Sequence, residues 1–156
     1  MSFDYNSLID KASIQHTKLA IINKEKLTYF IDNTIGLHTL ERYPVLSSGI
    51  IRTEDIQIFN IGHDVFWKEF IKSSINKLDE IIDLDFELMP NNNGSMLDIY
   101  HVNYSSTFEE NVIGEAISQR SKYGSWWEIL WKNSNLSGQI NLNSDKNTLI
   151  HELGHC

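Results

Sequence analysis

The sequence predicts an α+β fold in which a mixed, twisted sheet of about five strands packs against two helices, the second of which ends the chain. Two observations carry this prediction. One long stretch has apolar residues at helical spacing, and several short runs of alternating or β-branched residues follow it. A second helical stretch then closes the chain. Strands joined across a helix pair in parallel, whereas strands joined by turns pair with their neighbours, so the sheet is expected to be mixed.

Length and composition indicate a single soluble globular domain. The chain has 156 residues, of which 41% are hydrophobic, and this is enough for one core. Its net charge of -8 argues against a nucleic-acid surface, which needs clustered Lys and Arg. No apolar run approaches the length of a membrane span, and the first residues lack the features of a secretory signal. We therefore expect neither nucleic acid nor a membrane as a partner.

The folded domain is expected to begin at residue 26. Residues 1–25 show no clear periodicity and are interpreted as an N-terminal arm, which leaves residues 26–156 as the domain. Residues 27–31 are rich in β-branched and aromatic side chains and end at a turn-forming segment, residues 32–36, which predicts a buried strand. Residues 56–58 predict a second short strand.

The clearest helix is predicted to begin at Asp64. Apolar residues recur after it at steps of three or four, and lysines and an aspartate fill positions between them. This spacing predicts one buried side and one exposed side. The apolar positions are Trp67, Ile71, Ile75, Leu78 and Ile82.

Short strands are expected after this helix. The apolar period changes from about 3.6 to 2, and segments rich in Asn, Gly, Ser and Pro separate the runs. The last of these strands is expected to lead directly into the C-terminal helix. The predicted strands lie at residues 84–88, 96–102, 113–118, 126–131 and 140–143.

The last six residues hold the strongest functional signal. His151, Glu152 and His155 form a His-Glu-x-x-His pattern. On a helix, the four-residue step places both imidazoles on one face, close enough to share a metal ion. A zinc hydrolase uses such a pair to hold the ion, while a carboxylate outside the coordination shell takes a proton from water. His151 and His155 are therefore candidate zinc ligands, and Glu152 is the candidate general base.

The residues around this pattern favour a partly buried helix. Ser144 can cap it, and Asp145 places a negative charge in its first turn. Gly154 costs about 1 kcal/mol relative to alanine inside a helix, which suggests that a side chain or strand packs over its bare backbone. Cys156, the only cysteine, points about 100° away from the preceding ligand, so we expect a small buried residue. The apolar side of the helix consists of Leu149, Ile150 and Leu153.

The order of these elements resembles the N-terminal subdomain of a metzincin, the zinc endopeptidase clan that includes the matrixins and serralysin-like enzymes. Residues 67–88 resemble the clan's first long helix running into a Leu-Asp-Phe strand, and residues 97–99 resemble the next strand. Residues 114–116 and 140–143 resemble the last strands before the active helix. The most specific match is residues 148–155, TLIHELGH, which are similar to matrixin helices.

This resemblance implies a zincin-like fold and a zinc endopeptidase that acts on peptide or protein substrates and is commonly extracellular. It implies that His151 and His155 bind zinc, that Glu152 is the base, and that a third histidine follows six residues after His155. That position lies beyond Cys156, so we expect the 156 residues to be a fragment that is inactive alone. It also implies that an extended substrate pairs with an edge strand, expected within residues 126–138.

Two other interpretations stay open. A non-catalytic binding module or a truncated pseudoenzyme could keep a zincin-like fold, although a pseudoenzyme has no physical need for Glu152 beside two ligands. Another zincin class would take its last ligand from a glutamate on a later helix. Trp126, Trp127 and Trp131 are expected to fill the core and cover a strand edge, and a role for one of them in the substrate wall stays open. The other histidines have no metal-ligand spacing to a partner, and we expect them to be exposed or hydrogen-bonded. They are His16, His38, His63 and His101.

Overall fold

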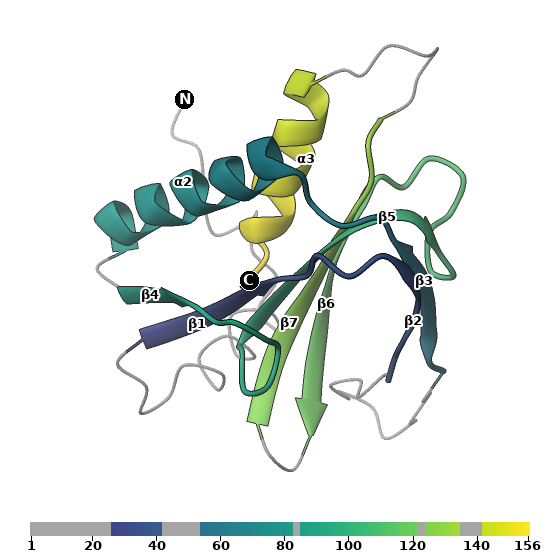
Figure 1. Ribbon diagram of the computed structural model, residues 1–156, viewed down its shortest axis with the longest axis horizontal. Helices are drawn as coiled ribbons and strands as arrows, with labels where there is room; N and C mark the ends of the chain where they lie inside the picture. Colours follow the sequence, from purple (N-terminus) through teal and green to yellow (C-terminus); the bar gives the residue numbers. More distant parts are fainter. Residues whose placement is uncertain (1–25, 42–53, 83–84, 122–123, 135–141) are drawn as a thin grey trace, which may run out of the picture.

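The computed structural model describes most of the predicted domain. In the described residues the fold is α+β, with a mixed sheet and two helices, as predicted (Figure 1). The predicted N-terminal arm lies outside them. The described residues are 26–41, 54–82, 85–121, 124–134 and 142–156.

Seven strands and two helices follow one another in the described part of the chain. Their order is three strands, a helix, four strands and a helix. The elements are β1 (Lys26–Ile31), β2 (Gly36–Leu40), β3 (Ile56–Asn60), α2 (Val65–Ile82), β4 (Asp85–Leu88), β5 (Leu97–Ser105), β6 (Gly114–Ser121), β7 (Gly124–Trp131) and α3 (Leu142–Leu153).

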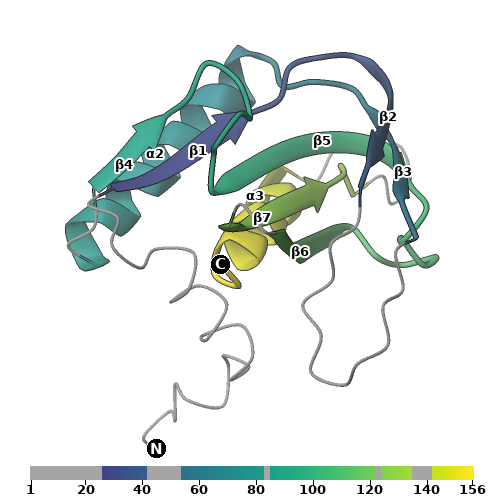
Figure 2. The ribbon, with the colours of Figure 1, turned by 90° about the horizontal axis from the view of Figure 1, so that it is seen from below.

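All seven strands join one sheet, with β5 at its centre. The first half of β5 pairs in parallel with β1 on one side and with β7 on the other. β4 continues the parallel part beyond β1, and β6 closes the other end antiparallel to β7. The far half of β5 pairs antiparallel with β3, which pairs with β2. Figure 2 shows the β2 and β3 pair turned away from the rest of the sheet.

The sheet has seven strands rather than the predicted five or so, several strands begin or end a few residues from their predicted bounds, and two differences are larger. The strand β2 was not predicted, because its alternation is short and follows a turn-forming segment. In addition, Leu142 and Asn143 lie in α3 rather than in a last strand, so Ser144 lies inside the helix and does not cap it. The carbonyl of Ser144 instead accepts a hydrogen bond from Thr148 Oγ1 at 3.0 Å. The rest of the predicted strand at residues 140–143 lies outside the described residues.

The helix α2 begins where the sequence predicts. Asp64 Oδ1 accepts a hydrogen bond from the main-chain N–H of Trp67 at 2.9 Å, which satisfies one of the N–H groups that the first turn leaves free. Trp67, Ile71 and Ile75 are buried, so the apolar stripe faces the sheet as the periodicity predicts.

Both helices pack on the same face of the sheet. Alternate residues of β1, β5 and β7 point to this face, because successive side chains of a strand point to opposite faces. They form one core with the buried sides of α2 and α3. A second, smaller core on the other face lies between β2, β3 and strands β5 to β7. The main core contains Tyr29, Ile31, Trp67, Ile71, Ile75, Leu97, Ile99, Trp127, Ile129, Trp131, Leu149 and Leu153, and the smaller core contains Leu40, Ile56, Ile58, Tyr100, Val102, Ile117 and Leu130.

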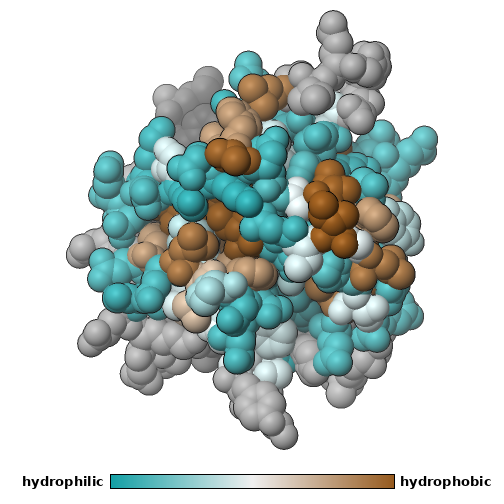
Figure 3. Space-filling view, viewed as in Figure 1, coloured by the Kyte–Doolittle hydropathy of each residue, from teal (hydrophilic) through white to brown (hydrophobic). Residues whose placement is uncertain are grey.

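The surface seen in Figure 3, which has the view of Figure 1, is mainly hydrophilic. Figure 3 shows separate apolar patches among polar residues on this face. Within the described ranges, neither helix is both long and apolar enough to cross a bilayer.

Candidate active site

The C-terminal end of α3 brings the two predicted zinc ligands together. His151 Nε2 and His155 Nε2 lie 3.1 Å apart, and the two rings meet edge to face with centroids 4.6 Å apart. Two imidazole nitrogens bound to one tetrahedral zinc ion, each at about 2.0–2.1 Å, are separated by about 3.3 Å. The observed separation is close to that value, and it is also the length of a hydrogen bond between the two rings.

Catalytic zinc sites have three protein ligands, and His151 and His155 are two candidates for them. Among the described residues, no third His, Cys, Asp or Glu gathers with His151 and His155. Glu152 points elsewhere, as expected for a residue between two ligands on a helix. The donor set is thus a pair of imidazoles with one carboxylate nearby.

Glu152 is buried beneath the edge strand β6. Its side chain is 7% exposed, and its carboxylate accepts a hydrogen bond from the main-chain N–H of Ala116. Burial raises the pKa of Glu152, and the negative charge of Glu115 adds to the rise, while His151 and the Ala116 N–H oppose it. A raised pKa brings a carboxylate closer to the pH at which a general base is most effective.

Gly114 allows this close approach between β6 and α3. A methyl group at Gly114 would lie 2.6 Å from Glu152 Oε1 and 2.7 Å from Thr148 Cγ2, which is shorter than van der Waals contact. Only glycine leaves room for Glu152 to lie against the strand. Sequence reasoning did not include Gly114 in the site, although a glycine within a strand is a signal for close packing against the backbone.

The prediction for Gly154 was wrong in the described part of the chain. Gly154 is exposed, and the atoms nearest to an added methyl group are carbonyl oxygens of its own preceding turn, the closest being that of His151 at 3.2 Å. None of the described strands packs over it. Cys156 is a partly buried residue against the main core, as predicted, and burial raises the pKa of its thiol. A neutral thiol is a poor metal ligand.

A groove of about 850 Å³ runs between the beginning of β6 and α3 and ends at His151 and Glu152. Its walls are mostly polar on the helix side and apolar on the strand side. The lining residues are Val112, Ile113, Gly114, Asn143, Ser144, Asn147, Thr148, His151 and Glu152.

The edge of the sheet beside this groove is β6. Among the described strands, β6 pairs only with β7, whereas β7 pairs with both β5 and β6. The expectation that the free edge lies within residues 126–138 was therefore wrong for residues 126–131, which form an inner strand. Residues 135–138 lie outside the described residues.

Contacts of two residues, Asp145 and Lys146, hold α3 in place. Asp145 is fully buried, and its Oδ1 accepts hydrogen bonds at 2.6 Å from both the main-chain N–H and the hydroxyl of Ser134. Lys146 Nζ lies 5.1 Å from the ring centroid of Phe66 and 5.2 Å from that of Phe70, within the range of cation–π attraction. These contacts connect α3 to the end of β7 and to α2.

The other described histidines are hydrogen-bonded, as predicted. His38 is half-buried, and its Nε2 lies 3.0 Å from Thr34 Oγ1. His101 is buried, with Nδ1 2.9 Å from the carbonyl oxygen of Gly62 and Nε2 3.0 Å from the side-chain amide of Asn133. Burial lowers the pKa of His101. His16 lies outside the described residues.

The two hydrogen-bond partners of His63 determine which of its ring nitrogens carries the proton. The Trp131 indole N–H donates to His63 Nε2 at 3.2 Å. In the neutral ring, Nδ1 therefore carries the proton and donates to the carbonyl of Asp32 at 2.9 Å. Burial lowers the pKa of His63 to about 4. A neutral histidine with both nitrogens in use is a structural residue.

The tryptophans divide between the two faces of the sheet. Trp127 and Trp131 lie in the main core, as predicted. Trp126 is half-buried on the opposite face, where its Nε1 donates to Glu128 Oε1 at 3.5 Å.

No protein-family model matches this chain, and neither a curated protein nor a solved structure is significantly similar to it. The chemistry must therefore be argued from the geometry of the site.

Replacing Gly114 with alanine is expected to lower catalysis more than metal binding. The added methyl group overlaps Glu152 and Thr148, so Glu152 must leave its position while His151 and His155 keep theirs. Overpacking of this kind costs about 1–3 kcal/mol of stability. Zinc affinity and peptide hydrolysis, measured on the same Gly114→Ala preparation, check this separation. An unchanged rate would show that the strand does not position the carboxylate.

Proposed function

We propose that this chain provides the base and two zinc ligands of a zinc-dependent endopeptidase. His151 and His155 would hold the ion, and Glu152 would be the general base. One observation carries the proposal: two converging imidazole nitrogens share a helix end with a carboxylate that lies against the backbone of an edge strand. The resemblance of residues 148–155 to matrixin helices supports it.

In this proposal, Glu152 transfers the proton of the attacking water during hydrolysis. A zinc ion at His151 and His155 would polarise the substrate carbonyl and lower the pKa of water. Glu152 accepts a proton from the attacking water and then gives it to the leaving amine. Its burial suits both steps, because a raised pKa makes a carboxylate a better proton acceptor.

The proposed substrate is a peptide in extended conformation. An edge strand presents N–H and C=O groups at the spacing of an extended chain, so a peptide can bind by adding a strand. Among the described strands, β6 is the edge that contacts α3. A peptide beside Gly114 would lie close to Glu152. A third protein ligand would complete the zinc site.

Removal of zinc is expected to abolish peptide hydrolysis by the complete gene product. Treatment with a chelator should stop cleavage of an unstructured polypeptide, and added zinc should restore it, because the carbonyl is not polarised without the ion. Mass spectrometry of the products identifies the bond that is broken. Cleavage that continues at full rate in chelator would contradict the proposal.

The same experiment distinguishes the non-catalytic alternative. A binding module or pseudoenzyme would retain zinc and bind the polypeptide without forming new amino termini. Saturating zinc with bound but intact polypeptide would therefore favour that interpretation over an endopeptidase.

A further inference from the structure

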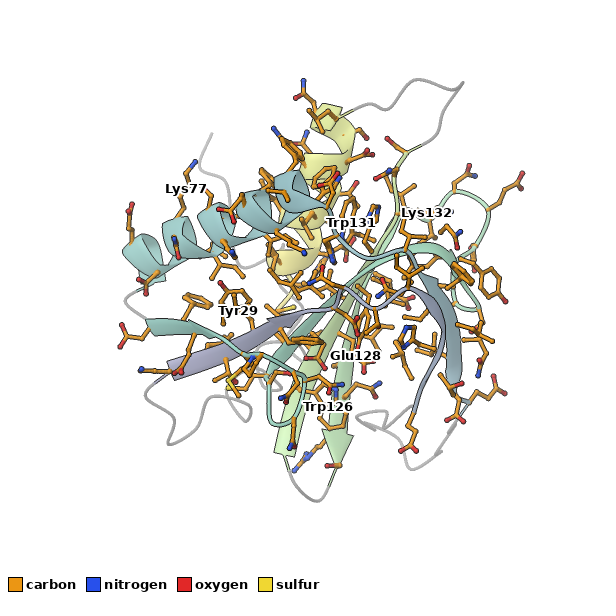
Figure 4. The ribbon with its side chains drawn as sticks, viewed as in Figure 1. Tyr29, Lys77, Trp126, Glu128, Trp131 and Lys132 are labelled. Atoms are coloured by element: carbon orange, nitrogen blue, oxygen red, sulfur yellow. The ribbon has the colours of Figure 1, made fainter. Side chains whose placement is uncertain are left out.

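Two acidic side chains lie side by side on the face of the sheet opposite the helices. Asp98 of β5 and Glu128 of β7 are direct partners in the parallel register. Their neighbours Ile99 and Ile129 point into the helix-side core, so the two carboxylates point to the other face. Both are buried, with exposures of 4% and 5%. In Figure 4, Trp131 lies close to the two helices, whereas Glu128 and Trp126 lie farther along the sheet from them.

The partners of these carboxylates are uncharged. The Ser95 hydroxyl donates to Asp98 Oδ1. Gln119 Nε2 donates to Glu128 Oε2 at 2.8 Å, and Trp126 Nε1 donates to Glu128 Oε1 at 3.5 Å. These hydrogen bonds satisfy polar atoms but do not neutralise charge.

Among the described residues, those around the two carboxylates add negative charge and no positive charge. Asp98 and Glu128 line a cavity of about 380 Å³. The other titratable residues on its described wall are Glu41 after β2 and Tyr100 of β5, and none of the described lining residues is Lys, Arg or His. Asp32, after β1, is close enough to disfavour the charged form of Asp98.

A buried pair of like charges without a cation is strongly unfavourable. Such groups usually avoid the cost by retaining a proton. Burial raises the pKa of Asp98 to about 7, and the negative charge of Glu128 adds to the rise. Burial also raises the pKa of Glu128.

We propose that Asp98 and Glu128 share one proton at neutral pH, and that loss of this proton destabilises the sheet that supports α3. The strands β5 and β7 carry the pair on one face and the core residues beneath the helices on the other. Two charges on adjacent strands repel across the β5–β7 pairing. The proton pair is thus a pH-sensitive element built into the centre of the sheet, and it does not depend on the proposed peptidase activity.

The direction of the effect follows from the pKa of Asp98. The folded protein holds a proton that the unfolded chain releases at its ordinary pKa of 3.8. The contribution to stability is therefore complete below about pH 4 and is lost as pH rises towards about 7. His63 and His101 act in the opposite direction, because their pKa values are lowered in the folded protein. A variant must therefore be compared with the natural chain at each pH.

Asp98→Asn tests the proposal by equilibrium unfolding at about pH 5 and about pH 8.5. Asparagine keeps an oxygen that accepts from Ser95 and has no charge. From about pH 5 to about pH 8.5, the unfolding equilibrium constant of the natural chain should rise on the order of 100-fold relative to that of Asp98→Asn. Glu128→Gln should show the same direction. Asp85→Asn, which removes an exposed carboxylate of β4, is the control and should follow the natural chain.

Two further measurements decide the outcome even if a variant does not fold. Infrared difference spectra of Glu152→Gln, which lacks the other carboxyl whose pKa burial raises, should show the carbonyl band of a protonated carboxyl disappearing between neutral and alkaline pH. Absence of that band would overturn the proposal. Unfolding at about pH 8.5 is then repeated with calcium or magnesium. Marked stabilisation of the natural chain but not of Asp98→Asn would also overturn it, because the pair would then be a cation site.

Discussion

Replacing Glu152 with glutamine is expected to lower kcat/KM for peptide hydrolysis by about 10²- to 10⁴-fold, the usual contribution of a general base. Glutamine has nearly the same shape and still accepts the hydrogen bond from the Ala116 N–H, but it cannot take up a proton. Zinc affinity should remain within a few-fold of the natural value, because His151 and His155 are untouched. Steady-state kinetics and zinc titration on the same preparation measure both.

Glu115→Gln is the matched control for this prediction. Glu115 is the other carboxylate that influences Glu152, and its charge raises the pKa of Glu152. Its removal should leave the maximal rate nearly unchanged and should move the acidic limb of the pH–rate profile to lower pH, because Glu152 would then lose its proton more readily. Full activity in Glu152→Gln would remove Glu152 as the base.

Replacing Trp131 with alanine is expected to lower the free energy of unfolding by about 3–5 kcal/mol, as for other large buried aromatic residues. Trp131 is fully buried, and its ring stacks on His101 with centroids 4.0 Å apart. Its indole N–H also donates to His63 Nε2, so truncation leaves a cavity and an unpaired buried nitrogen. Denaturant unfolding monitored by circular dichroism measures the loss.

Trp126→Ala provides the comparison, because Trp126 is the same residue type on the same strand but only half-buried. It should cost clearly less. Equal losses for the two variants would show that the cluster around Trp131 does not dominate the packing beneath the helices.

Much of the fold follows from local pattern. The stripe from Trp67 to Ile75 has a helical period, and Asp64 supplies a cap, so α2 is determined by its own residues. The strands β1, β5 and β7 are likewise rich in apolar and β-branched residues that alternate or run continuously. The strand β2 could not be predicted, because Leu37 is 68% exposed and the strand depends on pairing with β3.

The beginning of α3 shows why the connection before it was misread. The alternation that includes Leu142 is compatible with a strand, but Asp145 is bound by Ser134, a residue eleven positions earlier. That contact depends on the tertiary structure and has no local signal. In the structure, the helix begins at Leu142, two residues before Ser144.

The candidate site likewise has one part that follows from local sequence and another that depends on the tertiary structure. The sequence places His151, Glu152 and His155 on one helix, and helical geometry brings the two imidazoles together. Gly114 and the edge strand are contributed from elsewhere in the chain, so their position beside Glu152 depends on the order of strands in the sheet. The acid pair of Asp98 and Glu128 likewise follows from the register of β5 and β7, which the sequence does not specify.

Zinc titration of the complete gene product tests the central claim most directly. The account predicts about one zinc ion per chain, and a fall in affinity of more than about 100-fold in both His151→Ala and His155→Ala, because each variant removes a direct ligand. His38→Ala, which removes a half-buried histidine outside the site, should bind zinc as the natural chain does. Zinc binding that survives both substitutions, or that is absent from the natural chain, would contradict it.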